Sequence, residues 1–138
     1  MTRRTFAWSM LLVLATLARH GGTATSHADE RLEFFEKKIR PALVQHCTRC
    51  HGAQADEPQG GLRLDLQAGW QQGGDSGQPA IVPGDPNASP LIRAIQHADG
   101  VSAMPPKQPR LPDAVVADFV TWVQAGAVDQ AGDQHADV

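Results

Sequence analysis

The stretch Cys47-Thr48-Arg49-Cys50-His51 contains both cysteines of this 138-residue chain, and a histidine directly follows the second. On a helical turn, side chains three and four positions apart lie on one face. The two thiols can therefore reach one edge of a bound group, while the His51 imidazole, four residues after Cys47, can reach its centre. This pattern is the attachment signature of c-type haem, in which both thiols are bonded to the porphyrin and the histidine ligates the iron.

Three other interpretations of the cysteine pair agree less well with the sequence. A disulfide between cysteines three residues apart closes a very short loop and restricts the unfolded chain little. A thioredoxin-like redox pair is expected in a βαβ setting, whereas the flanking residues have helical periodicity. A structural zinc ion needs four ligands, and the chain has no second cysteine pair. We therefore expect one covalent haem c, attached through Cys47 and Cys50, with His51 as an iron ligand.

The second axial ligand of the iron is expected to be Met104. Because Met1 and Met10 lie in a predicted export signal, Met104 is the only methionine of the expected mature chain. Two prolines follow it and restrict the backbone next to the thioether. Histidine and methionine together are a common ligand pair in cytochromes c and raise the reduction potential. Two alternatives stay open: Met104 packs against the haem without ligating it, or His97 is the ligand.

Hydrophobic periodicity predicts an all-α fold of three or more helices joined by long loops. We expect a first helix over residues 29–50, which Pro41 kinks or restarts, and a short helix near residues 66–70. A third helix begins at Ser89-Pro90, with serine as its cap, and reaches about residue 97. The last covers about residues 112–125 and ends at Gly126. Residues 52–86 and 99–112 are expected to be loops, and the first of these is long enough to need a cofactor to pack against.

Both ends of the chain differ in composition from its middle. Arg3 and Arg4 precede an apolar run at residues 7–18, which is too short to span a bilayer, and Ser26-His27-Ala28 offers a small-x-small cleavage site. We expect a signal peptide at residues 1–28, a cytochrome domain at 29–128 and a disordered polar tail at 129–138. The mature protein is then exported, for example to the periplasm, without a membrane span. Retention of the signal as an uncleaved anchor is the alternative.

Net charge limits the classes of partner. The expected cleavage removes three of the twelve basic residues and none of the fifteen acidic ones, which changes the formal net charge from −3 to −6. No basic block remains that could bind nucleic acid. A partner with a basic patch is favoured through electrostatic steering.

Eight short motifs in a fixed order resemble the planctomycete-type cytochrome c domain, a branch of the class I cytochromes c. The resemblance implies a class I fold, in which three to five helices and long loops wrap around one covalent haem and the first and last helices cross. It also supports Met104 as the distal ligand. The motifs are residues 35–41 (FEKKIRP), 47–52 (CTRCHG), 60–65 (GGLRLD), 73–77 (GGDSG), 81–86 (IVPGDP), 89–92 (SPLI), 104–107 (MPPK) and 122–127 (WVQAGA).

Several residues are candidates to surround the haem. The other ring nitrogen of His51 needs a hydrogen-bond acceptor, and a backbone carbonyl within residues 58–62 is the expected one. Phe119 and Trp122 are expected to form core against the haem edge. The candidates to contact the haem propionates are Arg63, Trp70 and Arg93, each of which could instead be a surface cation or a packed aromatic ring.

These observations predict an electron-transport domain and not an enzyme, since no acid–base pair or activated nucleophile stands out in the sequence. The expected partners are redox donor and acceptor proteins. One alternative is a fixed redox module of a larger exported oxidoreductase. A further alternative is a haem enzyme with an open iron position that acts on peroxide.

Overall fold

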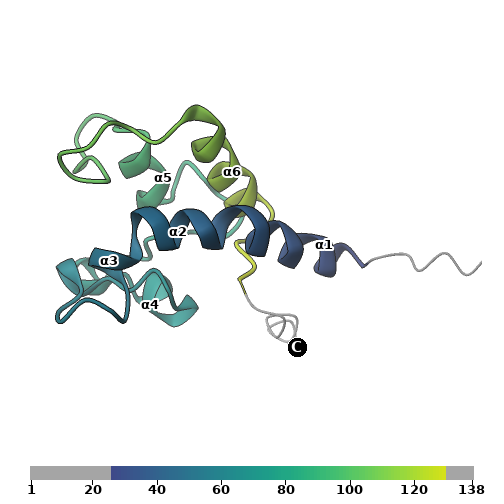
Figure 1. Cartoon of the computed structure of the whole chain (residues 1–138), viewed down its shortest axis with the longest axis horizontal. Coiled ribbons are helices and arrows are strands. Elements are labelled where there is room, and N and C mark those ends of the chain that lie inside the picture. Colours follow the sequence, from purple (N-terminus) through teal and green to yellow (C-terminus); the bar gives the residue numbers. More distant parts are fainter. Residues whose placement is uncertain (1–25, 130–138) are drawn as a thin grey trace, which may run out of the picture.

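The computed structural model describes residues 26–129, and this part of the chain contains helices and loops but no strand. Its first element is a nearly continuous helical rod made of α1 (His27–Phe34), η1 (Phe35–Ile39) and α2 (Arg40–His46) (Figure 1). After a break at Cys47, α3 (Thr48–His51) continues the chain. The all-α prediction is confirmed for the described residues.

Pro41 explains why the rod is not one regular α-helix. Proline has no backbone N–H, so it cannot donate the hydrogen bond expected four residues back. The helix widens just before it into a π-helical segment, in which the N–H of Arg40 donates to the carbonyl of Phe35, five residues earlier. α2 then begins with Pro41 in its first turn, where the missing donor costs little. The helix thus restarts at Pro41, as predicted, because α2 begins with this proline in its first turn.

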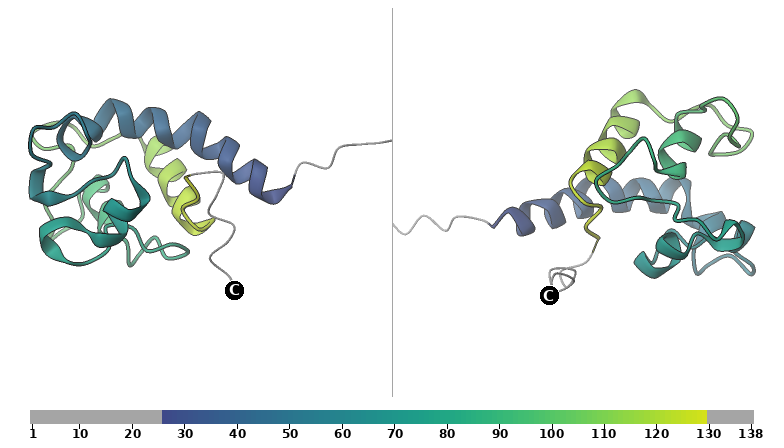
Figure 2. Two further views of the ribbon diagram at one scale, coloured as in Figure 1. Left: turned by 90° about the horizontal axis from the view of Figure 1, so that it is seen from below. Right: turned by 180° about the vertical axis from the view of Figure 1, so that it is seen from behind.

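The remaining elements are short and separated by loops. η2 (Gln59–Gly61), α4 (Gln67–Gln72) and η3 (Gly74–Ser76) follow the rod. They are succeeded by α5 (Pro90–Ile95) and α6 (Asp113–Gln124), and the long segments between these helices are loops, as predicted. All views show α6 lying across the rod near the junction of α1 and α2 (Figures 1 and 2). This is the crossing of first and last helices that the family resemblance implies.

Aromatic side chains form the contact between α6 and the rod. The rings of Phe35 and Trp122 have centroids 5.6 Å apart, and Phe119 meets Trp122 edge-on at 6.2 Å. Phe119 and Val123 are completely buried. Because aromatic pairs in such tilted arrangements add to the stabilisation from burial, this contact anchors the terminal helices to each other.

Ser89 stands at the predicted position before α5, but its side chain does not cap the helix. Its hydroxyl is fully buried, donates to the carbonyl of Asp85 (2.8 Å) and accepts from the N–H of Val82 (2.9 Å). The hydroxyl thus bonds to the turn at residues 82–85 and not to the first N–H groups of α5. Ser89 therefore fastens this turn to the start of the helix.

The packed part of the chain extends one residue beyond the predicted domain boundary. Gly126, with φ of 103°, ends α6 as expected, and the next residues fold back onto the helix, where the indole N–H of Trp122 donates to the carbonyl of Val128 (2.8 Å). Asp129, assigned by sequence to the tail, is only 7% exposed. The rest of the predicted tail and residues 1–25 lie outside the described part of the chain. No helix within residues 26–129 is long and apolar enough to cross a bilayer.

Candidate haem site

Cys47, Cys50 and His51 lie on one helical turn. The N–H of Cys47 still bonds to the carbonyl of Leu43 at the end of α2 (2.8 Å). The carbonyl of Cys47 in turn accepts from the N–H groups of Cys50 (3.1 Å) and His51 (2.9 Å). Neither thiol is in a disulfide. The local geometry therefore has the shared face that the spacing predicted.

A cavity of about 420 Å³ lies against this turn, and both thiols, His51 and Met104 line it. A volume of this size is typical of cofactor sites, which range over about 300–1,000 Å³. None of its lining residues among those described is Asp, Glu, Lys or Arg. The rest of the lining is mainly aliphatic or proline and consists of Leu62, Leu64, Ala80, Pro90, Leu91, Ala94, Ile95, Val101, Pro105, Pro106 and Leu111, with His46, Ser76 and Ser102.

The His51 ring has no hydrogen-bond partner in the described part of the chain, and its Nδ1 is buried. The carbonyl acceptor expected within residues 58–62 is not present. Pro58 and Gln59 use their carbonyls inside the η2 turn, where they accept from the N–H groups of Gly61 (2.9 Å) and Leu62 (3.3 Å). An imidazole that the protein leaves unbonded beside an apolar cavity fits a role as ligand to a group in that cavity.

The Cys47 thiol differs from a redox-active or zinc-binding cysteine. Burial raises its pKa to about 11, and the nearby Cys50 adds to this shift. Reactive and metal-binding cysteines have a lowered pKa, because the thiolate is the species that reacts. In addition, no group of three or more His, Cys, Asp or Glu side chains within residues 26–129 could hold a metal ion. Two thiols, an imidazole and a thioether in one apolar cavity fit a covalently attached haem better than they fit a bare ion.

Met104 reaches the cavity from the loop after α5, whereas His97 does not line it. The N–H of Met104 donates to the carbonyl of Ala94 (3.0 Å), and its carbonyl lies 3.2 Å from Nε2 of His97. This contact occupies one of the two ring nitrogens of His97. The structure thus brings Met104, and not His97, to the same cavity as His51.

The candidates for propionate contacts lie outside this cavity. Residues 62–65 are extended, so successive side chains point to opposite sides. Leu62 and Leu64 line the cavity, whereas Arg63 and Asp65 do not. Arg63 instead forms a bidentate ion pair with Asp65, in which two guanidinium nitrogens donate to the two carboxylate oxygens at 2.7 and 2.8 Å. Arg93 donates to the carbonyl of Asp99 (3.4 Å) and does not line the cavity either.

The hydrogen bonds between Arg63 and Asp65 are the main cause of two pKa shifts: they lower the pKa of Asp65 and raise the pKa of Arg63. Asp65 also accepts from the N–H of Ala53 at 2.8 Å, two residues after His51. The Arg63–Asp65 pair therefore braces the loop that leaves the haem-attachment turn.

Trp70 is likewise away from the haem cavity. It is 1% exposed, and its indole N–H donates to the carboxylate of Asp129 (3.3 Å). It lines a separate cavity of about 140 Å³. Phe119 and Trp122 form core, as expected, but neither lines the haem cavity.

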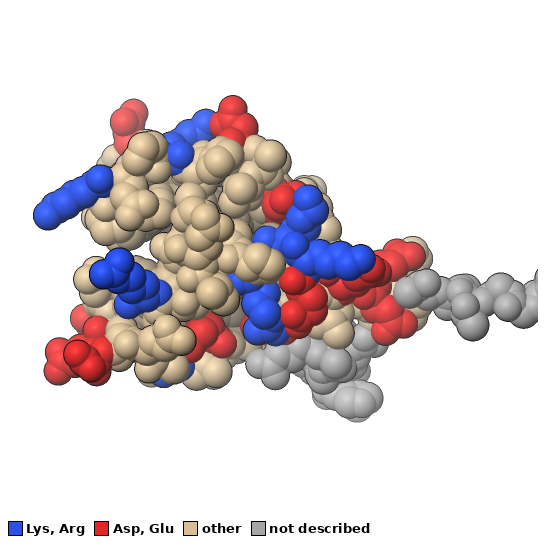
Figure 3. Space-filling model, in the orientation of Figure 1, with Lys and Arg blue, Asp and Glu red and all other residues tan. Residues whose placement is uncertain are grey.

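Charged side chains on the rod are mostly paired. Figure 3 shows acidic and basic side chains beside each other along it. Lys37 bonds to Glu33, Arg40 to Glu36 (2.6 Å), and Lys38 lies 3.8 Å from Asp118 of α6. This arrangement does not form a patch of one sign on the rod.

Residues 47–108 match the family described as planctomycete cytochrome C. This segment is similar to that family, as the motifs in the sequence predicted. The matched segment of this cytochrome begins at Cys47 and extends just past Met104, so it includes every sulfur atom of the cavity. The similarity indicates a domain for haem-based electron transfer that exchanges electrons with redox partners. No curated protein and no solved structure matches the chain.

Two features of the cytochrome site were missed by sequence reasoning. His46, which was not among the expected site residues, lines the cavity. The contact of His97 with the Met104 carbonyl was also missed, because it depends on the path of the loop at residues 98–103. The alternation of Leu62 and Leu64 with Arg63 was the available signal that Arg63 would face away from the cavity.

Proposed function

We propose that this cytochrome domain carries single electrons through one haem c. Cys47 and Cys50 would hold the porphyrin, and His51 and Met104 would be the axial ligands of the iron. One observation supports the proposal above all: these four side chains line a single apolar cavity. When bound, haem iron supplies one-electron chemistry by changing between the ferrous and ferric states.

The chain's own residues would set the properties of this centre. A thioether ligand such as Met104 favours the ferrous state and raises the reduction potential. The aliphatic lining excludes water and offers no charged side chain, which further disfavours the ferric state with its additional positive charge. Among the described residues, the cavity lining contains no carboxylate, lysine or arginine that could move protons in a reaction on a bound substrate; its only histidines are His51, the proposed iron ligand, and His46 beside Cys47. Electron transfer therefore suits the cavity better than peroxide chemistry.

The direct test of ligation is a spectrum of the oxidised wild-type protein. We expect a sulfur-to-iron charge-transfer band, and no binding of carbon monoxide by the reduced form, since Met104 would occupy the sixth position. Ready binding of carbon monoxide by the wild type would instead show an open position and favour the enzymatic alternative.

We further propose that the mature protein is exported to the periplasm after cleavage behind Ala28 and exchanges electrons with separate donor and acceptor proteins. The signal-like composition of residues 1–28 supports export, because haem is attached to c-type cytochromes after export. N-terminal sequencing of the mature protein should find Asp29 first. Co-purification in fixed ratio with a larger oxidoreductase would show a fixed module in place of a free carrier.

A further inference from the structure

The C-terminal turn of α5 holds both backbone polar groups of Met104. The carbonyl of Ala94 accepts the Met104 N–H (3.0 Å), and the His97 ring contacts the Met104 carbonyl through Nε2 (3.2 Å). A carbonyl oxygen can only accept, so Nε2 of His97 must carry the proton and donate it. The two bonds lie on either side of the residue whose thioether enters the cavity.

The turn that makes these bonds is itself firmly placed. Ile92 and Ile95 of α5 are almost completely buried, while Ala94 lines the haem cavity. The turn closes through the N–H of Ala98, which donates to the carbonyl of Arg93 (3.0 Å). By contrast, residues 99, 100, 102 and 103 of the loop that leads to Met104 are exposed. The position of Met104 is therefore tied to α5 and not to the preceding loop.

The backbone of His97 indicates that its side chain is needed there. Its φ is 57°, in the left-handed region that glycine adopts most easily at the end of a helix. A glycine at this position would relieve the backbone but would leave the Met104 carbonyl without its side-chain donor.

We propose that His97 is a positioning residue that keeps the Met104 thioether against the haem iron. This inference rests on the proposed His51/Met104 ligation and extends it. The bond from a methionine sulfur to ferric iron is weak, so its persistence depends on how closely the backbone confines the sulfur. Loss of the His97 bond frees one side of Met104 and makes the thioether easier to displace.

The test compares variants of the haem-loaded protein in the ferric state at one fixed pH. His97→Leu and His97→Gly remove the donor, and the glycine also relieves the left-handed backbone. His97→Gln retains an N–H donor at the same number of bonds from the main chain. Gln96→Leu, at the exposed neighbouring position, is the matched control. The measurements are the sulfur-to-iron charge-transfer band, the rate at which added imidazole displaces the thioether, and the midpoint of thermal unfolding.

We expect His97→Leu and His97→Gly to bind imidazole about tenfold faster than the wild type, the effect of losing one hydrogen bond. His97→Gln and Gln96→Leu should stay close to the wild-type rate. His97→Gly should show this faster exchange without a lower unfolding temperature, which separates positioning from general stability. Unchanged exchange in both donor-free variants would overturn the inference, as would exchange rates that only follow the unfolding temperature. A wild type that lacks the charge-transfer band would instead contradict the proposed Met104 ligation itself.

Discussion

Met104 is the residue on which the assignment of the second ligand depends. Met104 and His51 come from segments more than fifty residues apart, yet both residues line one cavity. Sequence reasoning reached Met104 by eliminating the two methionines of the export segment. The structure adds that its N–H is bonded to Ala94 of α5 and its carbonyl to His97, two residues after that helix.

Replacement of Met104 by alanine should open the iron to external ligands. We expect Met104→Ala to lose the sulfur-to-iron charge-transfer band, to bind carbon monoxide when reduced, and to have a lower reduction potential, because thioether ligation raises it. Optical spectroscopy and redox titration check these outcomes. A variant that kept the band and the potential of the wild type would show that Met104 only packs in the cavity.

Asp65 should make stability depend on pH in the acid range. Its folded-state pKa is lowered by Arg63 and by the Ala53 N–H, so its charged form stabilises the fold above about pH 4, the range of an unfolded aspartate. This contribution is lost as pH falls through the lower folded-state pKa. Asp65→Asn should therefore cost about 1–2 kcal/mol at neutral pH and progressively less below about pH 4. Denaturant unfolding of the wild type and the variant, at neutral pH and below pH 4, measures this cost. A difference in the free energy of unfolding that did not change with pH would contradict the assigned role.

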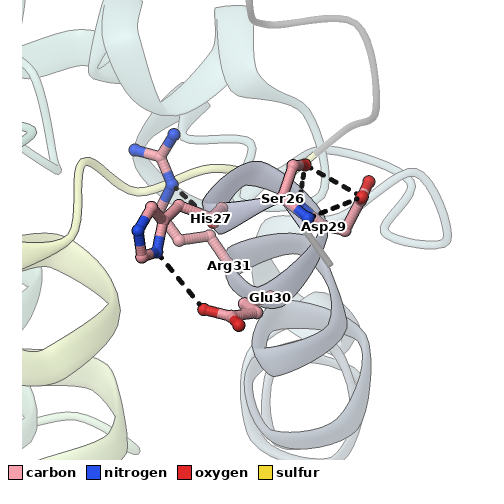
Figure 4. A network of polar contacts seen from close by, with 5 residues as sticks. All are labelled: Ser26, His27, Asp29, Glu30 and Arg31. Carbon is pink, nitrogen blue, oxygen red and sulfur yellow. Dashed lines mark hydrogen bonds and ion pairs between the residues drawn. The ribbon is translucent and has the colours of Figure 1, made fainter. Parts of the chain in front are cut away.

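At the scale of elements, α1 is a helix without a buried residue. Figure 4 shows its capping box, in which Ser26 and Asp29 bond to each other's backbone N–H groups (3.2 and 3.3 Å). The expected cleavage behind Ala28 would remove the Ser26 cap together with His27 and Ala28, the first two residues of this helix. Because α1 contributes no buried residue, and the core of the rod begins at Phe35, the haem site should be unaffected.

The start of α5 depends on the buried Ser89 hydroxyl more than a helix usually depends on an exposed capping side chain. Ser89→Ala leaves the Val82 N–H and the Asp85 carbonyl without their buried partner, so we expect a loss of about 1–3 kcal/mol in the free energy of unfolding. Asn87→Ala, at an exposed site in the same turn, is the control and should change stability little. Equal effects of the two substitutions in denaturant unfolding would argue against a structural role of the Ser89 hydroxyl.

Elements with strong periodicity were predictable from the sequence, and contacts between distant segments were not. The rod, α5 and α6 follow from hydrophobic spacing and from Pro41, Pro90 and Gly126. The haem-attachment turn follows from the spacing of its cysteines. The Trp70 bond to Asp129 was not accessible, because it joins residues 59 positions apart through loops without periodicity. The same reason hid the contact of His97 with Met104.

At the scale of the whole molecule, the described part of the chain has two parts: the terminal helices, and the central segment around the haem cavity. The terminal helices, which lie outside the segment that matches the family, supply the aromatic core in which Phe35 meets Trp122. The matched segment supplies the attachment turn, α5 and the Met104 loop, and these together enclose the cavity. The division separates a scaffold that stabilises the fold from a central part that holds the electron-transfer centre.

The most direct test of the central claim is a pyridine haemochrome spectrum of the purified exported protein, combined with its intact mass after denaturation. We expect a c-type haemochrome and a denatured mass that exceeds the mass of the polypeptide by one haem, because thioether bonds through Cys47 and Cys50 survive denaturation. A haem b spectrum, or a denatured chain that carries no haem, would contradict the central claim.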